Sequence, residues 1–95
     1  MHKYLKDHIL EEIEGAIDYM TKAVEHKKDE WGHVFCKMAN MELDHANALT
    51  KMYMKTEKPK TMTDADYSEM TKAILTAYSD GMGKVEAMKK LYWAE

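Results

Sequence analysis

The stretch MANMELDH, residues 38–45, places a Glu-x-x-His pair, Glu42 and His45, inside the apolar stripe of a predicted helix. Side chains three residues apart lie on one helical face. A carboxylate in such a stripe is costly to bury without a partner, so the pair needs a cation or a strong hydrogen-bond partner. A metal ion would satisfy both residues at once.

Apolar residues at spacings of three and four predict two amphipathic helices around this stretch. The helix that carries the pair should run to about Thr56, before Lys58-Pro59 ends it, and its apolar stripe comprises Trp31, Val34, Phe35, Met38, Met41, Leu49 and Met52. An earlier helix over residues 3–28 has the stripe Leu10, Ile13, Ile17, Met20 and Val24. We expect a turn at Lys28-Asp29 between them, with Asp29 as the N-cap of the second helix.

A third helix is predicted after the polar linker around Pro59. It should open at Thr63, where Asp66 three residues on resembles a capping box, and it should be loosened at Gly81-Met82-Gly83. Val, Ile and Phe are too few and too scattered to give strands. The sequence therefore predicts an all-α domain over residues 1–95, with a metal-binding hairpin at 1–57 and a third helix at 62–95.

Composition excludes several classes of function. The 14 basic and 17 acidic residues are mixed along the chain, which argues against a nucleic-acid-binding face. No apolar run has the roughly 18 residues of a membrane span, and no signal peptide is apparent, so we expect a cytoplasmic protein. Cys36 is the single cysteine, and the predicted stripe leaves it partly exposed.

A third ligand should come from the first helix. In an antiparallel hairpin, reflection of Glu42 and His45 about the turn lands near Glu14, at the edge of the apolar stripe. Glu11, one turn earlier and further round the helix, is the second choice. Other histidines are placed on polar faces: His8, His26 and His33.

Glu14, Glu42 and His45 are oxygen and nitrogen donors that suit iron(II), manganese(II) or zinc. Three ligands leave a metal under-coordinated, and the third helix supplies none. Two hairpins related by a two-fold axis would form a four-helix bundle, with four carboxylates and two imidazoles around two divalent ions. We therefore expect a homodimer or a higher even oligomer.

A first-helix glutamate, here Glu14, followed on the next helix by Glu42-Leu-Asp-His45, resembles the ferritin-like superfamily. The run of residues 39–46 is most similar to the second helix of rubrerythrin-type proteins. The resemblance implies that Glu42 bridges two iron ions per dimer while Glu14 and His45 are terminal ligands. It also implies ferroxidase-type oxidation of iron(II), with Glu14, Glu42 and His45 as the catalytic residues.

The chain departs from full-length members of that family, because residues 60–95 contain no second Glu-x-x-His. It therefore resembles the half-size ferritin-like proteins, including encapsulated ferritins, that assemble the site between two subunits. The Cys pairs of a rubredoxin-like iron site are missing, and residues 92–95 show no obvious tail for targeting to an encapsulating shell. The alternative is a non-catalytic helical assembly protein, with Glu14 and His45 paired as a core ion pair.

Overall fold

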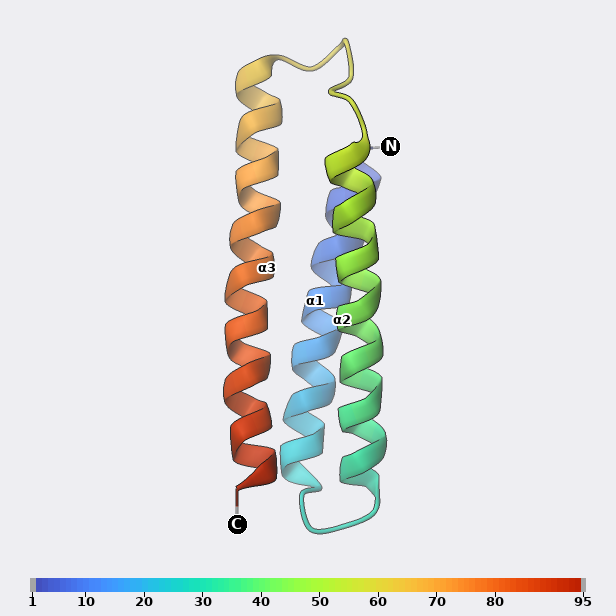
Figure 1. The fold of residues 1–95 in the computed structure, drawn as a ribbon, viewed down its shortest axis with the longest axis vertical. Coiled ribbons are helices and arrows are strands. Elements are labelled where there is room, and N and C mark those ends of the chain that lie inside the picture. Colours follow the sequence, from blue (N-terminus) through green and yellow to red (C-terminus); the bar gives the residue numbers. More distant parts are fainter. Residues whose placement is uncertain (1, 95) are drawn as a thin grey trace.

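The computed structural model describes residues 2–94, and the side chains of residues 3–94. It contains three helices, α1 (His2–Glu25), α2 (Trp31–Lys55) and α3 (Asp64–Trp93), and no strand among the described residues. Helix α1 runs antiparallel to α2 and parallel to α3, and it lies between them in Figure 1. The domain is a rod of 52 × 17 × 15 Å. The prediction of an all-α chain with a helical hairpin and a third long helix is confirmed.

The ends of the helices follow local hydrogen bonding. The predicted N-cap of α2 is wrong by one residue, because Glu30 and not Asp29 occupies the cap position. The Asp29 carboxylate still accepts hydrogen bonds from the Trp31 backbone N–H at 2.8 Å and from the His26 ring at 2.9 Å. Thr63 caps α3 as predicted, since its side chain accepts from the Asp66 N–H. Helix α3 continues without a break through residues 81–83.

Helix α1 supplies the centre of the core. Its buried residues recur every three or four positions: Leu5, Ile9, Ile13, Ala16, Met20 and Ala23. They meet α2 and α3 in two clusters, one toward each end of the rod. Gly81 of α3 packs directly on Ile13, because a Cβ at Gly81 would overlap the Ile13 side chain. This close approach holds α3 against α1.

The buried face of α2 is not the predicted stripe. It is formed mainly by smaller residues one position further round the helix: Gly32, Cys36, Ala39, Leu43, Ala46 and Tyr53. The expectation of a partly exposed Cys36 is wrong, because only 8% of this residue is exposed. Small side chains let α1 and α2 approach closely, so they occupy the seam between the helices. Large apolar residues of the predicted stripe are left exposed on the neighbouring face: Trp31, Val34, Met41 and Met52.

Candidate metal site

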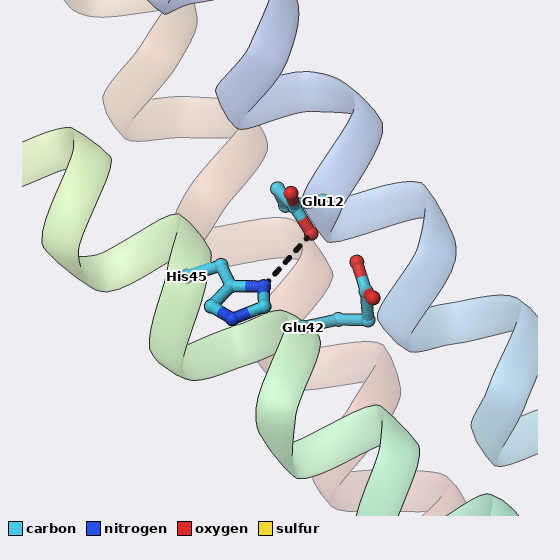
Figure 2. Close-up of side chains that lie close together, drawn as sticks. All are labelled: Glu12, Glu42 and His45. Carbon is cyan, nitrogen blue, oxygen red and sulfur yellow. Dashed lines mark ion pairs between the residues drawn. The ribbon is translucent and has the colours of Figure 1, made fainter.

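The hairpin brings two carboxylates and an imidazole together. Glu12 of α1 faces Glu42 and His45 of α2, and each residue offers one ligand atom within 4.8 Å of those of the others. The Glu12 Oε2 atom lies 3.6 Å from Nδ1 of His45. Figure 2 shows the three side chains converging between the two helices, with α3 behind the hairpin in this view. The group is therefore held by the α1–α2 pairing.

The site lies at the edge of the core. Glu42 and His45 are one helical turn apart beside the buried Leu43 and Ala46, while Glu12 adjoins the buried Ile13. The Glu12 side chain is 14% exposed, whereas that of His45 is 56% exposed, which corrects its placement in the interior. An adjoining hollow of ≈370 Å³ is lined by His8, Glu12, His45, Ala48 and Leu49. An ion could reach the three donors from the open side.

The two carboxyls interact strongly with each other. Hydrogen bonding with Glu12, then burial and the Glu12 charge, raises the pKa of Glu42 above its ordinary value. The same hydrogen bond lowers the pKa of Glu12, an effect that the neighbouring His45 and His8 reinforce. In the metal-free protein Glu42 is therefore the carboxyl of the pair that is harder to ionise, and Glu12 the one that ionises more readily. A divalent cation in the same place would neutralise both carboxylates.

The residues predicted on α1 lie elsewhere. Glu14 is exposed and does not join the group, and its role as a ligand stays a prediction that rests on the sequence alone. Glu11 is also exposed and lines a separate hollow with Tyr4, Asp7 and His8. Reflection about the turn finds the level on α1 of the third residue of the group but not the face on which it lies. Glu12 lies about 160° around the helix from Glu14, on the side that meets α2.

The sequence interpretation also missed His8. Its Nε2 atom is 3.0 Å from Oε1 of Glu12, one turn further along α1, so His8 extends the group of polar residues toward the N-terminal end of α1. The four-residue spacing of a histidine and a glutamate was a usable signal, because such residues are neighbours on a helix. It was overlooked because His8 was placed on a polar face.

Comparisons with protein-family models, with curated proteins and with solved structures find no match to this chain. The resemblance to ferritin-like proteins therefore stays a prediction carried by Glu42-x-x-His45 and a glutamate on the first helix. Within residues 2–94, none of the helices is both long and apolar enough to cross a membrane.

Proposed function

We propose that this chain binds divalent transition metal through Glu12, Glu42 and His45, and that a second copy completes a two-iron site that oxidises iron(II). The observation that carries the proposal is the convergence of two carboxylates and one imidazole from facing helices. Oxygen and nitrogen donors of this kind suit iron(II), with manganese(II) and zinc as competing ions.

The electrostatics of the metal-free group favour cation binding. Two carboxylates that face each other repel, and the hydrogen bond with Glu12, burial and the Glu12 charge raise the pKa of Glu42. A divalent metal ion would offset the repulsion by binding both groups in their ionised form. His45 would contribute a neutral nitrogen, so the cluster would bind the metal without adding a second positive charge.

A second copy is the occupant that best fits the open side of the hairpin. Four large apolar residues lie within about 40° of His45 around α2, and each is about half exposed: Trp31, Val34, Met41 and Met52 at 55, 44, 50 and 54%. Such a stripe along a helix is typical of a helix–helix interface. A two-fold related copy would cover the stripe and bring a second set of three ligands to the same level. Four carboxylates would then balance two divalent ions.

Glu12, Glu42 and His45 of two copies would hold a pair of iron(II) ions, which would supply the two electrons for reduction of dioxygen to hydrogen peroxide with uptake of two protons. The chain's own contribution is to hold anionic ligands that stabilise the more highly charged iron(III) product. The apolar stripe around His45 would exclude bulk water from the paired site.

Metal titration of the purified protein tests the ligand set. We expect cobalt(II) and iron(II) to bind, and Glu12→Gln, Glu42→Gln and His45→Gln each to weaken binding about tenfold or more. Glu14→Gln and Glu11→Gln are matched controls, because both residues are exposed glutamates of the same helix outside the group. Wild-type protein that binds neither ion would overturn the proposal. Loss of affinity in Glu14→Gln but not in Glu12→Gln would instead restore the ligand set predicted from the sequence.

Two further measurements test the shared site and its reaction. Sedimentation should show a dimer or a multiple of it when metal is bound, and a stable monomer with full metal occupancy would contradict sharing. Addition of iron(II) should consume dioxygen in wild-type protein and much less in Glu42→Gln. Iron binding without oxygen consumption above the rate in buffer would reduce the function to metal binding.

One contact favours the alternative, a helical assembly protein without a metal. The His45 ring lies 3.6 Å from Glu12 and would form an ion pair with it when protonated. The pair involves Glu12 and not Glu14, and His45 is 56% exposed, so its contribution to stability is small. Under this alternative the dimer would form equally well with chelator or with metal.

A further inference from the structure

His8 and His45 contact different oxygens of the Glu12 carboxylate. The two oxygens of Glu12 have different neighbours, since Oε1 is 3.0 Å from Nε2 of His8 and Oε2 is 3.6 Å from Nδ1 of His45. Both histidines line the same ≈370 Å³ hollow as Glu12. One oxygen of the carboxylate is therefore engaged by His8, while the other is the one nearer to His45.

The hydrogen-bond donor in the first contact is fixed by simple chemistry. A carboxylate only accepts hydrogen bonds, so the hydrogen between these atoms belongs to Nε2 of His8. A neutral His8 ring then has a bare Nδ1. Among the residues that the structure describes, this buried Nδ1 has no hydrogen-bond partner. Burial of an unpaired ring nitrogen is unfavourable. The hydrogen bond to Glu12 is therefore the interaction that favours this orientation of the His8 ring.

A second contact supports the orientation of the ring. The Tyr4 ring meets the His8 ring edge-on, with centroids 5.6 Å apart and planes at 66°. The His8 side chain is 34% exposed, compared with 14% for Glu12. The imidazole is thus held between the Tyr4 ring and Oε1 of Glu12, with part of the ring open to solvent.

We propose that His8 is the positioning residue for Glu12: its Nε2–H holds Oε1, so that Glu12 binds metal through Oε2 alone. The inference rests on the proposed function. Hydrogen bonds from outer residues commonly orient carboxylate ligands, and their loss weakens metal binding about 10- to 100-fold. Glu12 would then supply one donor oxygen to the metal, while its other oxygen stays hydrogen-bonded to His8.

Two substitutions separate the hydrogen bond from the shape of the ring. His8→Phe keeps a flat ring beside Tyr4 but removes the donor, whereas His8→Gln keeps an N–H at a similar distance from the backbone. We expect cobalt(II) affinity to fall about tenfold or more in His8→Phe and to recover to within about threefold of wild type in His8→Gln. The visible absorption of bound cobalt(II) should change in His8→Phe, because Glu12 becomes free to bind through both oxygens.

His26→Phe is the matched control. His26 also lies in a histidine–carboxylate contact near an end of α1, but its partner is Asp29 at the turn, outside the metal group. This variant should keep wild-type cobalt(II) affinity and spectrum. Unfolding of each metal-free variant shows whether the fold is retained.

The outcomes distinguish this inference from the proposed function. Wild-type protein that binds no cobalt(II) overturns both. Wild-type binding together with an unchanged affinity and spectrum in His8→Phe overturns only the role of His8, as does an equal loss in His8→Gln and His8→Phe. In metal-free protein, nitrogen NMR should show the hydrogen of His8 on Nε2. Finding it on Nδ1 would overturn the assignment independently of any metal.

Discussion

Replacement of Gly15 by alanine should make the protein more stable and its metal binding weaker. Gly15 lies in the middle of α1 opposite Glu42, and a Cβ added there would be 3.0 Å from Oε2, 3.4 Å from Cδ and 3.6 Å from Cγ of that side chain. The nearest of these contacts is too short, whereas the other two are close to ordinary. Gly15→Ala therefore requires the Glu42 carboxylate to move while the helices stay in place.

The two effects have different magnitudes. Glycine to alanine in a helix interior raises stability by about 1 kcal/mol, and a shift at the flexible end of Glu42 offsets only part of that gain. Metal ligands must be held to within about 0.5 Å of their working geometry. A carboxylate displaced by a few tenths of an ångström should therefore lose about tenfold in affinity, which corresponds to about 1.4 kcal/mol.

Gly83→Ala is the control for the stability effect. Gly83 is an exposed glycine within α3, and among the described residues no atom lies within 4 Å of the Cβ that alanine would add. It should gain about 1 kcal/mol and bind metal as the wild type does. Urea denaturation of metal-free protein at one concentration measures the first quantity, and cobalt(II) titration the second. Unchanged metal affinity in Gly15→Ala would refute the placement of the Glu42 carboxylate next to Gly15. A loss of stability would refute the expectation that this carboxylate can move aside.

Three other substitutions test the packing and the electrostatics. Gly81→Ala should be less stable than Gly83→Ala, the exposed glycine replacement, by about 1–3 kcal/mol, because its methyl group would overlap Ile13. Equal urea midpoints for the two variants would contradict the close packing of α1 on α3. Glu42→Gln should raise the melting temperature of metal-free protein at pH 7. The pKa of the Glu42 carboxyl is raised by Glu12, so this group contributes stability at low pH that is lost as pH rises through that pKa. This gain should shrink as pH falls below about 4, where Glu42 becomes protonated in the unfolded chain as well, and a gain that persists undiminished there would exclude carboxylate repulsion as its cause. Tyr53→Phe should cost about 1 kcal/mol in urea denaturation, because it removes the 2.7 Å hydrogen bond from a buried hydroxyl to a threonine of α3; wild-type stability would show that this bond makes no net contribution.

The sequence predicted the elements of the fold better than their faces. Periodicity placed the three helices to within a few residues, and capping chemistry located the start of α3 at Thr63. It could not identify the buried face of α2, because apolar residues cover more than half of that helix. Hydropathy favours large residues such as Trp31 and Met41, whereas the seam with α1 selects small ones such as Ala39.

The same limitation explains why the sequence identified Glu42 and His45 of the candidate site but not their partner on α1. Glu42 and His45 were found because a polar pair interrupts an apolar stripe, and that signal lies within one helix. The partner on α1 depends on how two helices are rotated against each other, which a reflection about the turn does not determine. Glu12 is only two positions before Glu14, but that step turns the side chain from solvent to α2.

The position of Glu42 connects the fold to the proposed dimer. Around α2 it lies between two apolar arcs, the seam of small residues that packs on α1 and the exposed arc that includes Val34 and Met41. A residue at this boundary is within reach of Glu12 in its own chain and of any helix that covers the exposed arc. If the exposed arc had no role in assembly, there would be no reason for a candidate metal ligand to lie along it. His45 lies within that arc, with half of its side chain open to solvent, which is where a ligand shared between two copies has to be.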